Sequence, residues 1–218
     1  MTSFVIFILG TSIASFLTAW ADRYPKSILY PPSHCQTCMT PLNWWDLIPI
    51  LSYSYLRGNC RNCQSAIPLS NLANEIQGGI FAYSCWQNWL SPSWTFFLFM
   101  SLMLSHFDRK SCSFPLCFWS IPHCFLTLIL GLQYSPFFLL CMLIFYIFPW
   151  GIGAGDWAYL ASLSLLLPLN ALLIILQLAS CLALIDYWSK KRKGALPFLP
   201  FLHDACLIWL LWSHFSFI

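Results

Sequence analysis

Long apolar segments, separated by short polar connections, run through this sequence from end to end. Hydrophobic residues make up 59% of the chain and charged residues only 8%, whereas a soluble domain carries about 25% charged residues. The pattern excludes a soluble globular domain and predicts an all-α polytopic membrane protein with about eight transmembrane helices. The eight apolar runs are residues 2–20, 74–90, 94–107, 114–132, 135–150, 157–168, 170–188 and 197–216.

The first apolar run is expected to be a retained membrane helix. No charged region precedes it, Asp22 and Arg23 follow it at once, and the sequence shows no small-x-small cleavage site. A removable signal peptide typically has the charged region and the cleavage site.

All ten Lys and Arg residues lie in three of the connections between apolar runs. The connections near Ser91, Gln133 and Asn170 carry none. The positive-inside rule then places the charged loops in the cytoplasm and both termini outside. Both termini can lie on the same side only if the number of spans is even, so the short run 157–168 must be one of eight spans. The basic residues are Arg23, Lys26, Arg57, Arg61, Arg109, Lys110, Lys190, Lys191, Arg192 and Lys193.

The predicted domain organisation follows from these runs. Residues 1–20 form the first transmembrane helix, residues 21–73 form a cytoplasmic loop domain, and residues 74–218 form the transmembrane core. The loop domain is the one sizeable segment outside the membrane.

Four of the eleven cysteines form two Cys-x-x-Cys pairs with 21 residues between the pairs, at Cys35, Cys38, Cys60 and Cys63. This spacing is typical of a closed four-thiolate zinc site, which is structural rather than catalytic. A loop of this size builds little core alone, so bound zinc would supply its folding energy. Disulfides, disfavoured in the cytoplasm, and a redox pair are the alternatives. The other seven cysteines are most simply small apolar residues within the runs.

Two acidic residues, Asp108 and Asp156, stand at the inner ends of apolar runs, 48 positions apart. An ionisable residue at that depth is a candidate functional residue. The alternatives are a helix-end charge paired with Arg109 or Lys110 for Asp108, and a glycine-rich turn whose aspartate caps the next helix for Asp156. Of the other acidic residues, Asp22 and Asp46 are expected to be solvated, and Asp186 and Asp204 to pair with the 190–193 cluster.

Two carboxylates in contact cannot both ionise cheaply, so such a pair holds one proton. One member can then take a proton from water while the other donates a proton to a peptide carbonyl. This is aspartic-protease chemistry.

Several motifs resemble the prepilin peptidases, also called type IV leader peptidases, which are membrane aspartic proteases with a GxGD motif. Gly153-x-Gly155-Asp156 matches that motif. The resemblance covers nearly the whole chain, through Ser15-Phe16-Leu17, Arg23-Tyr24-Pro25, Cys35-x-x-Cys38, Asp46-Leu47-Ile48-Pro49-Ile50-Leu51-Ser52-Tyr53, Gly58-Asn59-Cys60-Arg61-x-Cys63, Glu75 and Leu196-Pro197-Phe198-Leu199-Pro200-Phe201-Leu202.

The resemblance implies cleavage of leader peptides from prepilin or pilin-like precursors at the cytoplasmic face of the bacterial plasma membrane, with Asp108 and Asp156 as catalytic residues. Short loops favour the competence-pilus type. Many members also methylate the new N-terminus with S-adenosylmethionine, for which no glycine-rich loop is visible here. The expected partners are precursor proteins and membrane lipid, with no nucleic acid.

The chain departs from the family pattern at three places. Ala158 replaces a common Lys, Asn71-Leu72 replaces Tyr-Pro, and Asp108 lacks the Ile-Pro-Asp stretch that usually follows it. These departures bear on secondary site residues more than on the two aspartates. The competing hypotheses are a non-enzymatic membrane scaffold with a zinc-binding docking loop and a proton-relaying transporter, although the internal repeats expected of a transporter are not visible.

Overall fold

The computed structural model describes residues 1–28, 30, 32–148, 153–191, 194 and 196–215. All regular secondary-structure elements among these residues are helices, and β-type backbone pairing is limited to two isolated bridges. The chain divides into two compact units, Met1–Thr95 and Phe96–Ile218. Arg192 and Lys193, which belong to the predicted basic cluster, lie outside the described residues.

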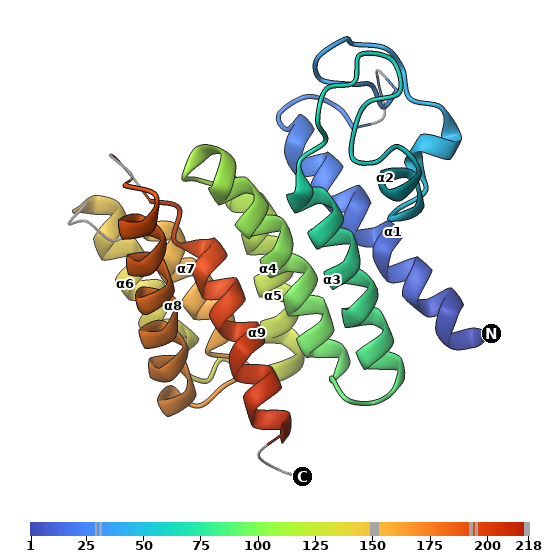
Figure 1. Cartoon of the computed structure of the whole chain (residues 1–218). Coiled ribbons are helices and arrows are strands. Elements are labelled where there is room, and N and C mark those ends of the chain that lie inside the picture. The colour runs from blue at the N-terminus through green and yellow to red at the C-terminus, as the bar shows by residue number, and fades with distance from the viewer. Residues whose placement is uncertain (29, 31, 149–152, 192–193, 195, 216–218) are drawn as a thin grey trace. The chain divides into compact units, whose positions relative to one another are not determined.

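In the first unit, helix α1 (Thr2–Arg23) packs along helix α3 (Leu69–Trp86), as Figure 1 shows. Small residues line the contact. A Cβ added at Gly10 would collide with the carbonyl oxygen of Gly78 and would lie 2.6 Å from the Cβ of Ala82. Small residues at a helix contact let two backbones approach closely, which is the usual way in which membrane helices associate.

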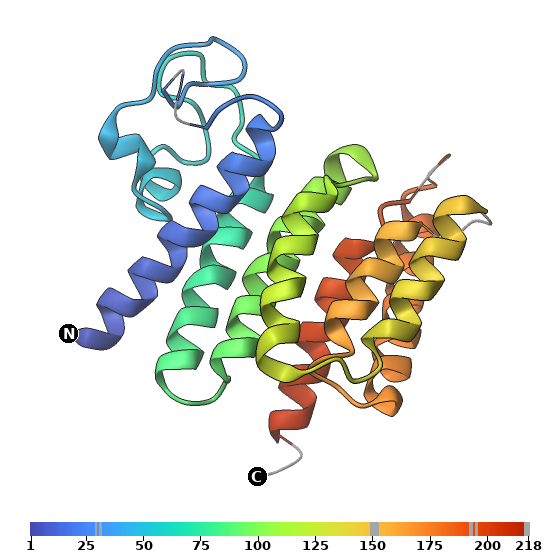
Figure 2. The same cartoon turned by 180° about the vertical axis from the view of Figure 1, so that it is seen from behind.

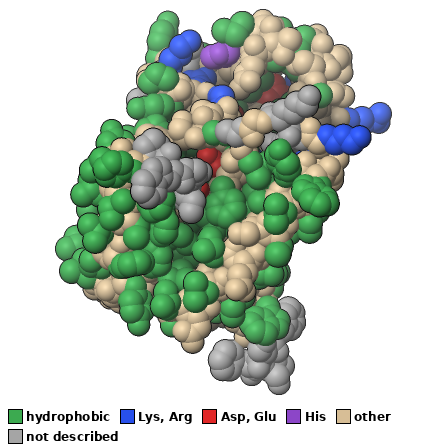
Figure 3. Space-filling model, turned by 90° about the vertical axis from the view of Figure 1, so that its left-hand side faces the viewer, with side chains coloured by type: hydrophobic (Ala, Val, Ile, Leu, Met, Phe, Trp, Pro, Cys, Tyr) green, Lys and Arg blue, Asp and Glu red, His purple; other side chains and the backbone are tan. Residues whose placement is uncertain are grey.

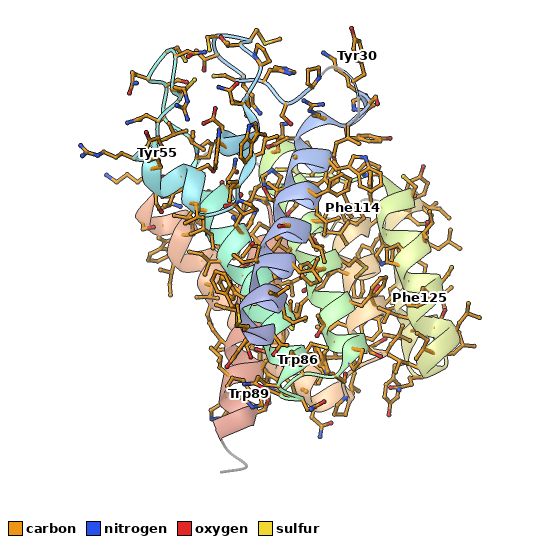
Figure 4. All side chains as sticks on the ribbon, turned by 90° about the vertical axis from the view of Figure 1, so that its right-hand side faces the viewer. Tyr30, Tyr55, Trp86, Trp89, Phe114 and Phe125 are labelled. Carbon is orange, nitrogen blue, oxygen red and sulfur yellow. The ribbon has the colours of Figure 1, made fainter. Side chains whose placement is uncertain are left out.

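The segment between α1 and α3 contains the 3₁₀-helix η1 (Trp44–Leu47) and the short helix α2 (Leu51–Tyr55). Its tyrosines Tyr30 and Tyr55 are 80% and 78% exposed and project outward in Figure 4. Helix α1 continues to Arg23, and α3 begins at Leu69. Asp22 therefore lies in the last turn of a helix rather than in the predicted loop.

Glu75 joins the connecting segment to both long helices of this unit. One carboxylate oxygen of Glu75 accepts a hydrogen bond from the hydroxyl of Ser15 on α1 at 2.8 Å. The other accepts one from the backbone N–H of Ile50, directly before α2, at 2.7 Å. Ile50 has a φ of +63°, a conformation that a β-branched residue rarely adopts. The carboxylate thus stabilises an unfavourable turn.

The second unit contains most of α4 (Pro92–Ser111) and five further helices, seen from behind in Figure 2. Helix α6 packs against α7, helix α8 packs against α9, and α5 contacts α7. The interior is filled by fully buried side chains such as Phe97, Leu104, Tyr159 and Leu202. The helices are α5 (Leu116–Leu130), α6 (Ser135–Ile147), α7 (Ala154–Leu163), α8 (Leu169–Ser189) and α9 (Leu199–Phe215).

Each of the eight predicted apolar runs overlaps one helix, namely α1 and α3 to α9 in chain order. Two of these helices, α1 and α8, are long and apolar enough to cross a membrane, and α5, α6 and α9 are shorter apolar helices. Hydrophobic side chains dominate the face of the second unit that Figure 3 presents. The all-helical fold is confirmed, and the eight-span topology stays a prediction.

Candidate metal centre and candidate active site

The four paired cysteines of the first unit come together in the folded chain. The sulfurs of Cys35, Cys38, Cys60 and Cys63 all lie within 4.8 Å of one another. The Cys35–Cys63 and Cys38–Cys60 distances are 3.7 and 3.9 Å. In a tetrahedral site with Zn–S bonds of about 2.3 Å, the sulfurs stand roughly 3.8 Å apart. The cluster can therefore hold a zinc ion with little movement.

The two Cys-x-x-Cys turns have the same local structure. The first cysteine of each turn donates its backbone N–H to a residue five positions later, Cys35 to Thr40 at 3.0 Å and Cys60 to Ser65 at 2.8 Å. The residue after each second cysteine has a positive φ, +57° at Met39 and +58° at Gln64. Two tight turns of one design thus present their sulfurs to a common centre.

Backbone N–H groups point at the first sulfur of each turn. The N–H groups of Cys38 and Thr37 bond to the Cys35 sulfur and lower the pKa of that thiol to about 5. The N–H groups of Cys63 and Asn62 also bond to the Cys60 sulfur, but burial and the neighbouring Cys35 and Cys63 side chains leave the pKa of that thiol raised. Such bonds favour the thiolate, which is the form that binds a metal.

Asp46 was expected to be solvated, and this expectation is wrong. Its carboxylate forms an ion pair with Arg61 at 2.6 Å, and its side chain is only 5% exposed. It also accepts the backbone N–H of Asn43 and so closes a capping box at the start of η1. Asp46 therefore connects η1 to the second cysteine turn.

Asp108 lies near the end of α4, and the residue is 7% exposed. Its Oδ2 atom accepts the backbone N–H of Leu199 at 3.0 Å, and the N–H of Phe198 is a second donor. Leu199 is the first residue of α9. The N–H groups of a helix's first turn have no partner within the helix and carry positive partial charge, so Asp108 caps α9.

The carboxylate of Asp156 lies in the first turn of α7, where Gly153 is the N-cap residue. The backbone N–H of Gly153 donates to this carboxylate. This is the acidic half of a capping box, so the predicted alternative of an aspartate that caps the next helix describes the local structure. Capping and catalysis are compatible, because a capped carboxylate keeps free lone pairs.

The structure brings the two aspartates together. The carboxyl groups of Asp108 and Asp156 lie within electrostatic range of each other, although the residues lie on different helices. The turn between them is tightly packed, since a Cβ added at Gly155 would lie 2.8 Å from the ring of Phe114. Gly155 thereby lets α7 begin close to the segment that follows α4.

The remaining acidic residues have different partners. Asp186 forms an ion pair with Lys190 at 2.5 Å, as expected. Asp204, which was expected to pair with the 190–193 cluster, interacts electrostatically with Arg109. The charge partner of Arg109 is therefore Asp204 on α9. Asp108, which precedes Arg109 in the chain, is instead held by backbone N–H groups.

The sequence alone did not reveal the donors to Asp108. Phe198 and Leu199 stand between Pro197 and Pro200, and proline has no backbone N–H. This spacing is a usable signal, because it leaves two adjacent donors at the start of a helix. The contact of Gly155 with Phe114 had no comparable signal.

The fold and these two sites define a helical protein that carries a four-sulfur cluster and, on separate helices, two interacting carboxylates. Residues 8–89 match the family model described as Bacterial Peptidase A24 N-terminal domain. The chain is also similar to proteins named prepilin leader peptidase/N-methyltransferase. These matches relate the chain to the prepilin peptidases.

Three relatives show the extent of the similarity. The protein of Myxococcus xanthus is 33% identical over 125 residues, which are 56% of this chain and 35% of the relative. The protein of Neisseria gonorrhoeae is 27% identical, with 73% of this chain and 63% of the relative covered. The protein of Pseudomonas aeruginosa is 25% identical, with 94% and 89% covered. The chain thus spans less than two thirds of the first two relatives. No solved structure matches it.

Proposed function

We propose that this protein is a membrane aspartic endopeptidase that removes the leader peptide from type IV prepilin or pilin-like precursors, competence pseudopilins included. Asp108 and Asp156 are the catalytic pair. The observation that carries the proposal is that these two carboxyl groups, 48 positions apart in sequence, lie within electrostatic range of each other, with Asp156 in the first turn of α7 and Asp108 bonded to the first residue of α9. A helix-end charge with a purely local role would not need a second carboxylate beside it.

The two carboxylates divide the chemistry between them. The ionised member takes a proton from a water molecule, and the protonated member donates a proton to the oxygen of the scissile peptide. Backbone N–H groups at two helix ends hold the carboxylates in place, which limits their motion during the reaction.

The four cysteines are the proposed ligands of a structural zinc ion. The sulfur distances fit tetrahedral coordination, and the N–H groups that point at Cys35 favour its thiolate. Zinc would hold the two turns together and supply folding energy to residues 21–73, which we propose as a separate cytoplasmic domain.

S-adenosylmethionine does not fit the apolar groove of about 460 Å³ beside α8 and α9. The groove is lined by Ser180, Ala183, Leu184, Tyr187, Leu196 and Phe198. Among the described residues, its lining offers no charged side chain to the sulfonium, amino and carboxylate groups of this cofactor. We therefore derive no methyl-transfer step.

In the proposed topology, eight helices span the bacterial plasma membrane and the aspartates face the cytoplasm. The one-sided distribution of Lys and Arg supports this orientation. The shortest of these eight helices, α7, has ten residues and a length of about 15 Å, roughly half of the hydrocarbon thickness. Its carboxylate would therefore lie within reach of water.

The test is co-expression of the full chain with the type IV prepilin that the Pseudomonas aeruginosa relative processes, in a host without its own leader peptidase. Leader loss is measured by the shift of the precursor on a gel and by the mass of the product. We expect processing with the unchanged chain and none with an empty vector. Unprocessed precursor beside well-expressed, membrane-embedded protein would contradict the proposed activity.

A further inference from the structure

Three buried polar side chains meet in the interior of the second unit. The hydroxyl of Ser101 lies 2.7 Å from the hydroxyl of Tyr159 and 2.7 Å from Nδ1 of His203. Ser101 and Tyr159 are 0% exposed and His203 is 1% exposed. A hydroxyl donates one hydrogen bond and accepts others, so Ser101 can serve both partners at once.

The three residues lie on the same helices as the candidate active site. Ser101 is seven residues before Asp108 on α4, Tyr159 is three residues after Asp156 on α7, and His203 is four residues after Leu199 on α9. Positions three, four or seven apart lie on one face of a helix. Each side chain therefore shares a helix face with one part of the aspartate site.

We propose that Ser101, Tyr159 and His203 form a positioning clamp that fixes α4, α7 and α9 so that Asp108, Asp156 and the N–H groups of α9 meet. The catalytic consequence rests on the proposed peptidase function, whereas the clamp itself does not. The three residues touch no reacting atom. They act through the helices that carry the aspartates.

Because the three side chains are buried, each of their polar groups needs a hydrogen-bond partner within the protein. A polar group removed from water loses free energy unless it is hydrogen-bonded, so the interior favours the single arrangement in which all three groups are paired. Apolar packing alone tolerates sliding between helices, because its contacts are not directional. The bonds through Ser101 therefore add a directional constraint on helix register to the constraint that apolar packing supplies.

A second buried network supplies a matched control. The hydroxyl of Ser162 on α7 accepts the indole N–H of Trp119 at 2.9 Å and lies 2.9 Å from Nδ1 of His123, both on α5. Ser162 is also 0% exposed and also serves two aromatic partners. Neither of these two contacts reaches α4 or α9. Removing the Ser162 hydroxyl therefore creates a similar cavity and loses a similar number of hydrogen bonds as removing the Ser101 hydroxyl, while the clamp stays intact.

The first measurement is hydrogen–deuterium exchange of the full chain in detergent micelles, followed in the peptide of residues 196–204. This peptide contains the Phe198 and Leu199 amides that bond to Asp108. We expect Ser101→Ala to speed exchange of these amides about tenfold and Ser162→Ala to leave it unchanged. If Ser101→Ala does not fold, Tyr159→Phe removes one hydroxyl and keeps the ring. Unchanged exchange in the folded variant, or equal acceleration by Ser162→Ala, would overturn the clamp.

The second measurement is the kinetics of prepilin cleavage by the same purified variants. A positioning role predicts that Ser101→Ala lowers kcat by about a hundredfold with KM unchanged, because a small displacement of reacting groups has that cost. Ser101→Thr, which keeps the hydroxyl, should restore most of kcat. A parallel loss with Ser162→Ala would mean that stability alone is affected and would overturn the positioning role. Inactivity of the unchanged chain would instead count against the peptidase proposal, while the exchange result would still decide the clamp.

Discussion

Asp108 and Leu199 lie 91 positions apart in sequence, yet Oδ2 of the aspartate accepts the backbone N–H of the leucine at 3.0 Å. Leu199 opens α9, and its N–H is one of the groups that a helix leaves unpaired at its start. The Pro197-Phe198-Leu199-Pro200 motif therefore belongs to the same site as the first aspartate. A change at the start of α9 should act on Asp108 directly.

Replacing either aspartate by asparagine should abolish leader cleavage. An amide neither accepts a proton from water at working pH nor donates an acidic proton, so we expect Asp108→Asn and Asp156→Asn each to lower the rate by about 10²–10⁴-fold. Both variants should stay in the membrane, since the side-chain shape is kept. The measurement is the ratio of processed to unprocessed precursor at matched enzyme levels.

Two other acidic residues serve as controls for this experiment. Asp186→Asn should change the rate of leader cleavage little, because Asp186 forms an ion pair with Lys190. Asp204→Asn should also change it little, because the charged neighbour of Asp204 is Arg109. Normal processing by either Asp108→Asn or Asp156→Asn would remove that residue from the mechanism. Lengthening either Asp108 or Asp156 to glutamate should also lower the cleavage rate, by roughly a hundredfold, because it displaces the carboxyl by about an ångström.

The helices were predictable from the apolar runs, because long hydrophobic segments leave the backbone few other ways to satisfy its polar groups in lipid. Even the short α7 was predicted, since the run after Asp156 ends near Pro168. The contacts of the segment between α1 and α3 were harder to predict. Asp46 was expected to be solvated because it lies among polar residues, but its partner Arg61 is 15 positions away, and sequence spacing does not reveal such a contact.

The predicted cysteines come together in space, and the two aspartates lie within electrostatic range of each other; their catalytic role stays a prediction. The Ser101, Tyr159 and His203 network was not predicted. Hydroxyls within an apolar run resemble small filler residues until the facing helix is known, and helix periodicity does not identify that helix. The Phe114–Gly155 contact was missed for the same reason.

Enlarging Gly155 should separate the start of α7 from the segment after α4. A Cβ there would lie 2.8 Å from the Phe114 ring, closer than van der Waals contact, so the ring or the backbone must shift. We expect Gly155→Ala to lower leader cleavage at least tenfold, because Asp156 is the next residue. Adding Phe114→Leu should recover part of the activity by making room. An active single variant, or a double variant no better than the single one, would contradict this explanation.

Purified protein should contain one zinc ion per chain, measured by elemental analysis. Cys38→Ser should lose the metal and make residues 35–63 more sensitive to proteolysis, because three thiolates no longer close the site. Cys85→Ser is the control, since Cys85 lies in α3 outside the cluster. Metal-free protein with four freely alkylated thiols in the cluster would exclude the zinc site.

Glu75→Ala should loosen the segment that carries the cysteines. The change leaves the Ile50 N–H and the Ser15 hydroxyl without their partner, and each lost bond to a charged group costs about 1.5–3 kcal/mol. We expect faster proteolysis between residues 40 and 60 with the zinc content retained, because Glu75 is not a metal ligand. Glu75→Gln keeps one acceptor oxygen, so its rate of proteolysis should fall between the rates of the unchanged chain and Glu75→Ala. Unchanged proteolysis in Glu75→Ala would show that the turn at Ile50 is held by other contacts.

Reporter fusions should place the connections on alternating sides of the membrane. Fusions at Ser91, Gln133 and Asn170 should report an external position, and fusions at Ser111 and Lys191 an internal one, because all Lys and Arg residues lie in the second kind of connection. Asn170 is the decisive site. It follows α7, whose ten residues are fewer than the about 20 that a perpendicular span needs. An internal signal there would mean that α7 enters the membrane and returns, or does not enter it. Either outcome would remove the sixth span and reverse the predicted side of every later connection.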